Sequence, residues 1–286
     1  MRIGFFTAGT IGAGHVVRGM ALERGLRRTG FSGEFRMFGP EEAFPTTQGP
    51  SRQIVRIHQD ELENPFTAES SALNKALHEY RPDLLLVDIF WAPLLYVLPV
   101  PGCECWLLIR KVPDRWLEGT FSSPFDPKPY TRIIGTEPLP FSALTDTIDP
   151  IVVCNPDECR PPDALRNKME VPDGHRLVVV AQAGMPGEVD KLDHETSPKD
   201  FVLHSSLIDR EAFFPLAEWL PGADLIYGGA GYNMFWEAKW LGYYDRCRFT
   251  AFERRVDDQA WRLQECDDYS MTHNGADQLA TWITQS

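Results

Sequence analysis

The chain has 286 residues, of which 43% are hydrophobic and 24% charged, as is ordinary for a soluble globular protein. This length is enough for two domains of about 140 residues each. The formal net charge of −13 excludes nucleic acid and anionic membranes as partners unless a local basic patch opposes the overall field, and no patch stands out beyond Arg24, Arg27 and Arg28.

The six cysteines form neither a C-x-x-C pair nor a zinc-type quartet, so we expect reduced thiols and a cytoplasmic protein. The chain opens on an apolar strand without a basic-then-apolar leader, which predicts that it is not secreted. Its most apolar stretch, LLLVDIFWAPLLYVLPVPG, contains Asp88 and three prolines. A spanning helix needs about 20 cleaner residues, so we predict a buried strand and a short helix there.

Short apolar runs alternate with helix-like segments along the whole chain. Strands are predicted at 3–7, 34–39, 84–89, 104–110, 132–136 and 150–155, and then at 177–182, 201–206, 224–229 and 247–252. Helices are predicted at 14–28, 67–80, 211–219, 232–241 and 256–265. This alternation is typical of an α/β protein with parallel sheets and right-handed crossovers.

Residues 156–174 are rich in proline and charge and lack apolar periodicity, which predicts a linker. The linker would separate an N-terminal α/β domain, residues 1–155, from a C-terminal α/β domain, residues 175–286, that ends in a helix. Open parallel sheets bind ligands outside the carboxyl ends of their strands, so we expect the site in the cleft between the two domains.

A glycine-rich loop, GTIGAGH, follows the first predicted strand and contains Gly9, Gly12, Gly14 and His15. Glycines allow a ligand to approach the backbone closely, and the helix that begins near Gly14 presents unpaired N–H groups to an anion. The spacing fits neither a P-loop nor a dinucleotide-binding motif. His15 is therefore either a capping or packing residue of a tight turn, or a neutral imidazole at a helix N-terminus that can accept a proton.

The second half carries a more specific set of residues. The segment DLIYGGAGYNMFWE contains a strand, a glycine turn and a helix, with Gly228, Gly229, Gly231, Tyr232, Asn233 and Glu237. The segment FERRVDDQ enters a further helix with Arg254, Arg255, Asp258 and Gln259, and VVAQAGMPGE closes a strand with Gln182 and Gly184. The glycine turn can hold a diphosphate, Glu237 can accept from ribose hydroxyls, and the Asp258–Gln259 pair can contact sugar hydroxyls. Together these groups predict a nucleotide-sugar site.

The loop GTIGAGH, the segment GGAGYNMFWE and the later DDQ resemble the GT-B superfamily of glycosyltransferases, especially the bacterial enzyme that adds N-acetylglucosamine in peptidoglycan synthesis. The resemblance implies two Rossmann-like domains facing across a cleft, a UDP-type donor as co-substrate and no cofactor or metal. It implies His15 as general base, Glu237 on the donor ribose, and Asp258 with Gln259 on the donor sugar. The chain is shorter than most such enzymes, and GYYDRCRF replaces the usual G-x-P after the glutamate helix.

The opening IGAGHVVRGMAL is also similar to short GT-B relatives that hydrolyse UDP-linked deoxysugars in pseudaminic acid synthesis. Three functions therefore stay open: an inverting, metal-independent transferase, a nucleotide-sugar hydrolase, and a non-catalytic nucleotide-sugar-binding subunit. No D-x-D motif indicates a metal-dependent donor site. The acceptor, either a small molecule or one reached at the membrane periphery, and the oligomeric state are not predicted.

Four further residues of the first half have two interpretations each. Trp91, Trp106 and Trp116 either stack on an acceptor or belong to the core. Asp88, at the end of a predicted strand, either binds acceptor hydroxyls or caps the next segment.

Overall fold

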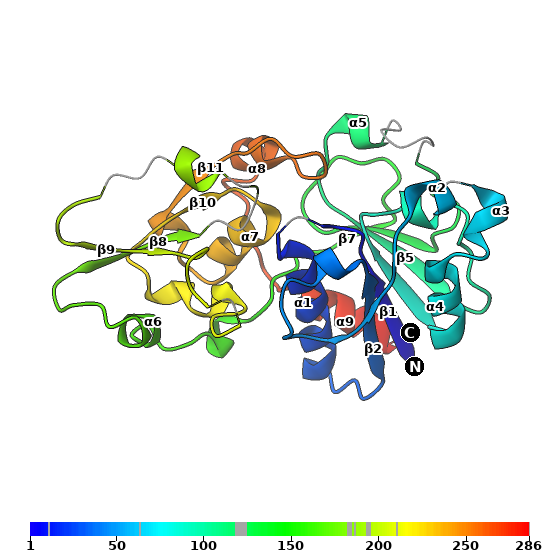
Figure 1. Cartoon of the computed structure of the whole chain (residues 1–286), viewed down its shortest axis with the longest axis horizontal. Coiled ribbons are helices and arrows are strands. Elements are labelled where there is room, and N and C mark those ends of the chain that lie inside the picture. Colours follow the sequence, from blue (N-terminus) through cyan, green and yellow to red (C-terminus); the bar gives the residue numbers. More distant parts are fainter. Residues whose placement is uncertain are drawn as a thin grey trace.

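The computed structural model describes residues 1–10, 12–62, 64–117, 125–181, 185, 187–192, 196–209 and 211–285. In this part of the chain, strands and helices alternate and form two lobes, each built on one parallel sheet (Figure 1). Both termini lie in the lobe of the first sheet. The predicted α/β architecture with two parallel sheets is confirmed.

The first sheet has seven strands in the order β3-β2-β1-β4-β5-β6-β7. Their bounds are β1 (Arg2–Phe6), β2 (Glu34–Gly39), β3 (Ser51–Ile54), β4 (Leu84–Asp88), β5 (Glu104–Ile109), β6 (Arg132–Gly135) and β7 (Asp146–Thr147). All neighbours in this sheet are parallel, and β4 is buried along its full length because helices cover both faces. The sheet thereby brings the carboxyl ends of β1 and β4 side by side.

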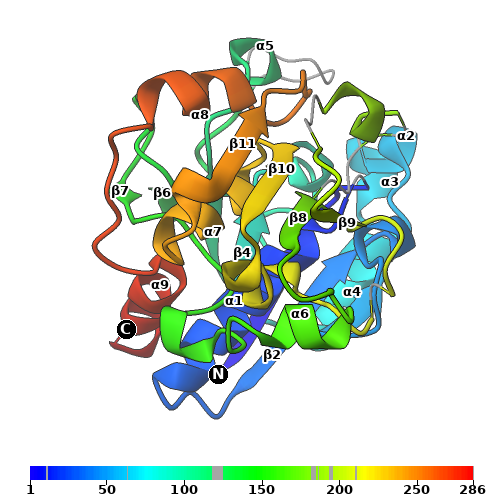
Figure 2. The same cartoon turned by 90° about the vertical axis from the view of Figure 1, so that its left-hand side faces the viewer.

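The second sheet has four parallel strands in the order β11-β10-β8-β9. Their bounds are β8 (Arg176–Ala181), β9 (Asp200–His204), β10 (Leu225–Gly229) and β11 (Cys247–Thr250). Figure 2 views the molecule from the side of this lobe. The helices of the described chain are α1 (Gly14–Arg28), α2 (Gln59–Leu62), α3 (Pro65–Ala68), α4 (Ala72–Tyr80), α5 (Asp114–Leu117), α6 (Ala164–Lys168), α7 (Tyr232–Trp240), α8 (Gln259–Glu265) and α9 (Gly275–Gln285).

Four predicted elements differ from the observed ones. Residues 150–155 form no strand: they are an extended, largely buried crossing segment whose amides bond to side chains, as in Ile151 N to Tyr232 Oη (2.8 Å). Residues 211–219 form turns and a short 3₁₀ helix, because Pro215 interrupts the segment. The helix predicted at 67–80 begins only at α4, whose N-cap is Ser71, and the one at 256–265 begins at α8.

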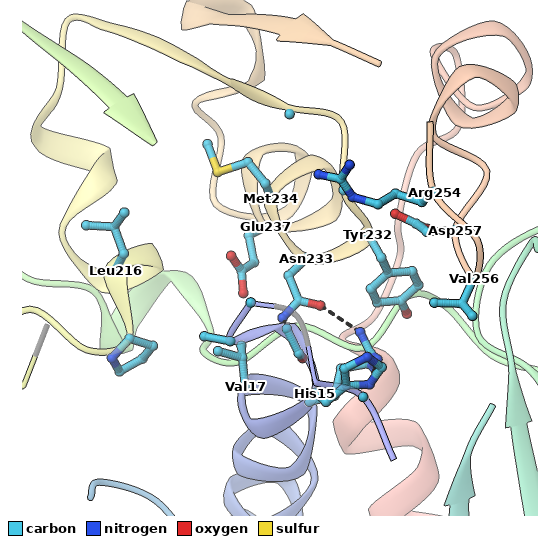
Figure 3. A pocket seen from close by; sticks show the side chains of 18 of the residues that line it. His15, Val17, Leu216, Tyr232, Asn233, Met234, Glu237, Arg254, Val256 and Asp257 are labelled. Atoms are coloured by element: carbon cyan, nitrogen blue, oxygen red, sulfur yellow. Dashed lines mark hydrogen bonds between the residues drawn. The ribbon is translucent and has the colours of Figure 1, made fainter. Parts of the chain in front are cut away.

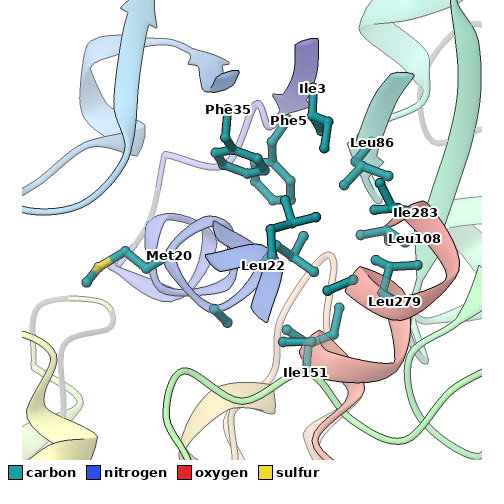
Figure 4. Packing of buried hydrophobic residues seen from close by; sticks show 14 of the residues in the cluster. Ile3, Phe5, Met20, Leu22, Phe35, Leu86, Leu108, Ile151, Leu279 and Ile283 are labelled. Atoms are coloured by element: carbon teal, nitrogen blue, oxygen red, sulfur yellow. The ribbon is translucent and has the colours of Figure 1, made fainter. Parts of the chain in front are cut away.

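The main hydrophobic core lies between the first sheet and helices α1 and α9 (Figure 4). Leu22 of α1 packs with Phe5 of β1, and Leu279 and Ile283 of α9 complete the cluster. Gly25 allows this close approach, because a Cβ there would lie 2.6 Å from the backbone oxygen of Ala276. The sequence assigned residues 175–286 to the second domain, whereas the structure packs α9 into the first.

Residues 156–174, the predicted linker, carry structure of their own. Helix α6 lies within them, and its Leu165 is fully buried in the hydrophobic cluster of the second sheet. The segment therefore packs against the second domain through apolar contacts and is not an unpacked linker between the two domains.

Candidate active site

A cavity of about 540 Å³ lies between the two domains, where the sequence placed the ligand site. Its wall in the first domain comes from the loop after β1 and the first turns of α1, and its wall in the second comes from α7 and residues 254–257. In Figure 3, His15 and Val17 on α1 face Asn233 and Glu237 on α7. Both walls are formed at the carboxyl ends of parallel strands, as expected for open sheets.

Most of the site residues predicted from sequence line this one cavity. They are Gly12, Gly14, His15, Gly229, Gly231, Tyr232, Asn233, Glu237, Arg254 and Gln259. Gln182 and Gly184 lie outside the described residues. Asp258 is described, but it does not line the cavity.

His15 is held by Asp88, which ends β4 beside β1. The imidazole Nδ1 lies 2.6 Å from Asp88 Oδ2, and Arg18 donates to the same carboxylate through Nε (3.0 Å) and Nη2 (2.8 Å). All three side chains are buried. Burial alone would raise the pKa of Asp88, but Arg18 and His15 hold that pKa well below its usual range. The carboxylate is thus ionised and can only accept. Arg18 Nη2 also lies 2.7 Å from His15 Nδ1, but the shorter contact, 2.6 Å to Asp88, is the one in which Nδ1 donates; Nε2 is then the acceptor of the neutral ring.

The imidazole packs on Gly9 and is neutral at physiological pH. A Cβ at Gly9 would lie 2.2 Å from His15 Nε2, so only glycine fits here. Burial, reinforced by the Arg18 guanidinium, lowers the pKa of His15 to about 4. Nε2 has no hydrogen-bond partner among the residues that the structure describes. Of the two interpretations that the sequence left open, the neutral imidazole is the one that agrees with this pKa, although burial rather than the helix N-terminus is its main cause.

Asn233 joins the two walls of the cavity. Its Oδ1 accepts from Arg18 Nη1 (3.1 Å) and its Nδ2 donates to the backbone oxygen of Gly14 (3.1 Å). The amide predicted to bind the donor therefore holds α7 against α1 in this structure.

Glu237 carries a buried carboxyl group whose Oε1 has no hydrogen-bond partner in the described protein. Burial is the main cause that raises the pKa of Glu237 to about 8, so the group is largely protonated at neutral pH. An unpartnered polar atom in a cavity wall is a site for a ligand hydroxyl, since leaving it unpaired is costly.

The raised pKa of Glu237 predicts how the free energy of unfolding depends on pH. Between about pH 5 and pH 8 the folded protein keeps a proton on Glu237 that the unfolded chain has lost, so the free energy of unfolding falls as pH rises. Glu237→Gln lacks this fall. We expect urea denaturation to show that the variant's gain in the free energy of unfolding over the unmodified protein is larger at pH 8.5 than at pH 5, by at most about 1.4 kcal/mol for each unit of pKa shift. The exposed Glu265→Gln on α8 is the control, and equal gains at both pH values would contradict the expectation.

Two further predictions concern the loop before α8. Asp258 is the N-cap of this helix: its Oδ1 accepts from Trp261 N (3.0 Å), and its contact with the donor sugar stays a prediction from sequence. Gln259 does line the cavity; its Oε1 accepts from Phe252 N (3.0 Å) and its Nε2 lies near Gly231. Arg254 also lines the cavity and is paired with Glu188.

Arg18 and Arg110, to which the sequence gave no role, line the cavity, as does Asp257, the first residue of the DDQ segment. Asp257 directly precedes the residue that was chosen, and its carboxylate pairs with Arg262 (2.7 Å). The aromatic ring of Tyr232 lies among the guanidinium groups of Arg18, Arg110 and Arg262, at 5.4–5.6 Å from its centroid. One sequence signal could have found such residues: a polar side chain at the carboxyl end of a predicted strand. Both Asp88 and Arg110 occupy such a position.

The tryptophans divide between the core and the cavity. Trp91 and Trp106 are buried in the hydrophobic clusters of the first domain. Trp116 lines the cavity and meets Phe90 edge-on, with 6.0 Å between ring centroids. Phe90 in turn contacts the imidazole of His15. The cavity wall beside His15 is therefore aromatic.

Neither a metal cluster nor a membrane span is found in the described part of the chain. No group of three or more His, Cys, Asp and Glu side chains there could hold a metal ion. No helix among the same residues is long and apolar enough to cross a membrane. The six cysteines are free thiols.

Solved structures similar to this one are glycosyltransferases. The Streptomyces sp. SF2575 glycosyltransferase SsfS6, complexed with thymidine diphosphate, matches with a TM-score of 0.57 and 15% identity over 100% of both chains. Phytolacca americana UGT2, complexed with UDP-2fluoro-glucose and pterostilbene, matches at 0.53 and 13% identity over 99% of this chain and 90% of that one. Glycosyltransferase VinC in complex with DTDP matches at 0.51 and 13% over 100% and 90%. The chain has the GT-B fold.

No protein-family profile and no curated protein sequence matches this sequence. The GT-B fold confirms the architecture that the sequence predicted, with two parallel-sheet α/β domains and a cavity between them. The narrower resemblance to the peptidoglycan enzyme and to the deoxysugar hydrolases stays a prediction from sequence.

Proposed function

We propose that this GT-B chain is a glycosyltransferase that moves a sugar from a nucleoside-diphosphate sugar to an acceptor hydroxyl, with inversion and without a metal ion. The observation that carries the proposal is the buried His15–Asp88 pair, whose neutral imidazole lies in the wall of the interdomain cavity. Facing it across the cavity are the start of α7 and the unpartnered carboxyl group of Glu237. Similar structures were solved with thymidine diphosphate and with UDP-2fluoro-glucose, which supports a nucleotide-sugar donor.

In the proposed reaction the acceptor hydroxyl hydrogen-bonds to His15 Nε2. The hydroxyl oxygen attacks the anomeric carbon as its proton passes to Nε2, and the bond between the anomeric carbon and the phosphate oxygen breaks. Asp88 stabilises the imidazolium that forms and fixes the tautomer that began the step. A single displacement at the anomeric carbon inverts its configuration, and the nucleoside diphosphate leaves with the bonding electrons.

The donor is proposed to lie against the second domain. The N–H groups at the start of α7 and the helix dipole favour the diphosphate, and Glu237 binds the ribose hydroxyls. The aromatic side chains of Phe90 and Trp116 near His15 provide stacking surface for the acceptor, which favours a small molecule with an apolar or ring-bearing body.

A thermal-shift screen with UDP, TDP, GDP and CMP sugars tests the donor site. A ligand at 100 times its Kd raises the free energy of unfolding by about 2.7 kcal/mol, so the right nucleotide stands out from the others. The selected donor is then incubated without acceptor. Slow release of sugar supports transfer, fast stoichiometric release shows a hydrolase instead, and no stabilisation by any nucleotide sugar contradicts the proposal.

A further inference from the structure

Arg110 is a buried cation with unused donors in the wall of the cavity. It follows β5 directly and is 5% exposed. Its Nη2 donates to the backbone oxygen of Val256 (3.3 Å), but its Nε and Nη1 have no hydrogen-bond partner in the described protein. Buried N–H groups of a guanidinium are costly to leave unpaired, so this geometry calls for an acceptor from a ligand.

The neighbours of Arg110 do not supply that acceptor. Asp257 Oδ1 lies 3.5 Å from Arg110 Nε, and the same oxygen already accepts from Arg262 Nη2 at 2.7 Å. The aromatic ring of Tyr232 lies 5.6 Å from the Arg110 guanidinium and offers only its π face. Burial lowers the pKa of Arg110 to about 10, which still leaves the side chain positively charged at neutral pH.

Arg110 lies at the end of the cavity where α7 begins. Asp257, which Arg110 contacts, has its Oδ2 4.0 Å from the position that a Cβ on Gly231 would take, and Gly231 is the N-cap of α7. The nine-residue helix α7 presents its first N–H groups at this point. An anion placed here would meet the helix N-terminus from one domain and Arg110 from the other, beside the Asp257 carboxylate, which is paired with Arg262.

Two other arginines of the cavity wall have carboxylate partners. Arg254 pairs with Glu188, and Arg18 donates to Asp88 through two nitrogens. Both therefore donate to a carboxylate at hydrogen-bond distance, whereas Arg110 approaches Asp257 only at 3.5 Å. Among the buried N–H donors of the described residues that line the cavity, the unsatisfied ones belong to Arg110 of the first domain.

We propose that Arg110 binds the diphosphate of the donor and stabilises the negative charge that develops on it as the sugar leaves. The inference rests on the proposed transferase function and names a catalytic residue for it. The N–H groups of Arg110 donate to phosphate oxygens, and no proton is transferred. The electron pair of the breaking bond between the anomeric carbon and the phosphate oxygen stays on the phosphate. The contact also ties donor binding to the acceptor-side domain, so that the diphosphate is enclosed by both.

The test compares binding of nucleoside diphosphates and nucleosides by calorimetry. Arg110→Gln is expected to weaken binding of UDP or TDP, whichever the unmodified protein prefers, by about 10- to 100-fold, because a hydrogen bond to a charged group is lost. Binding of the matching nucleoside, uridine or thymidine, is expected to stay unchanged. Arg36→Gln is the control, since Arg36 also stacks on a tyrosine ring, that of Tyr80, but lies outside the cavity.

The possible outcomes distinguish a failure of the role of Arg110 from a failure of the proposed glycosyltransferase function. If the unmodified protein binds no nucleoside diphosphate, the proposed function fails and this inference with it. If Arg110→Gln binds the diphosphate as tightly as the unmodified protein, the role of Arg110 alone is overturned. Should Arg110→Gln fail to fold, Arg110→Lys decides: it keeps the charge without the planar fork, and a selective loss of diphosphate affinity is again expected, whereas full affinity overturns the role.

Discussion

Replacing His15 with alanine is expected to lower kcat for sugar transfer by about 10²- to 10⁴-fold, because the variant loses its positioned general base. Donor affinity is expected to change little, since the proposed donor contacts lie on α7 and the following loops. Steady-state rates with the donor found by thermal shift measure the loss. His78→Ala, an exposed histidine on α4, is the matched control and should leave the rate unchanged.

Asp88→Asn separates a catalytic His15 from a packing residue. The neutral amide would no longer fix the Nδ1–H tautomer or stabilise the imidazolium, so the rate should fall although His15 is intact. The pH profile adds a second readout. The neutral imidazole is the active form and its pKa is about 4, so the acid limb of kcat/KM should lie below about pH 5 rather than near 6.5. Near-normal turnover in His15→Ala would show that the histidine only packs on Gly9.

The elements that build the site were predictable because each carries a local signal. Helix α1 matches the predicted 14–28, and its Leu22 and Leu26 are buried as the apolar spacing required. The strand, glycine turn and helix around Gly231 were also expected, and the rule that ligands bind at the carboxyl ends of parallel strands placed the cavity.

The partners within the site were not predictable, since they depend on strand order. His15 and Asp88 are 73 residues apart and meet only because β4 pairs with β1 in the first sheet. The sequence pattern also could not decide which aspartate of the DDQ segment lines the cavity. Helix α8 begins at Gln259, so Asp258 becomes its cap and the neighbouring Asp257 enters the cavity wall.

The domain to which the terminal helix α9 belongs was also not predictable from local sequence. The apolar face of α9 predicts burial, but its position along the chain assigns it to the second domain. Its observed place beside α1 depends on the backbone contact that Gly25 permits with Ala276, which no local pattern reveals.

Glu137→Gln is expected to lower the free energy of unfolding by about 3–5 kcal/mol, since it breaks a buried ion pair and leaves the other charge uncompensated. Glu137 and Arg262 are both fully buried, with Arg262 Nε 2.9 Å from Glu137 Oε2. The same carboxylate accepts from Lys111 N (2.7 Å) and Trp236 Nε1 (2.8 Å). The glutamine side chain has the same shape as glutamate, but its NH₂ group cannot accept a hydrogen bond. At least one of these donors therefore loses its acceptor.

The network joins the two domains, because Glu137 and Lys111 come from the first and Trp236 and Arg262 from the second. Urea denaturation measures the loss, and Glu23→Gln, which breaks an exposed pair with Arg27 on α1, is the control at less than about 1 kcal/mol. The double variant Glu137→Gln with Arg262→Met should cost less than the sum of the two single variants, since they act on one ion pair. A cost below about 1 kcal/mol for Glu137→Gln would show that this buried pair does not hold the domains together. The cavity walls would then depend on the other contacts between the domains, such as those of Asn233 with Gly14 and Tyr232 with Thr136.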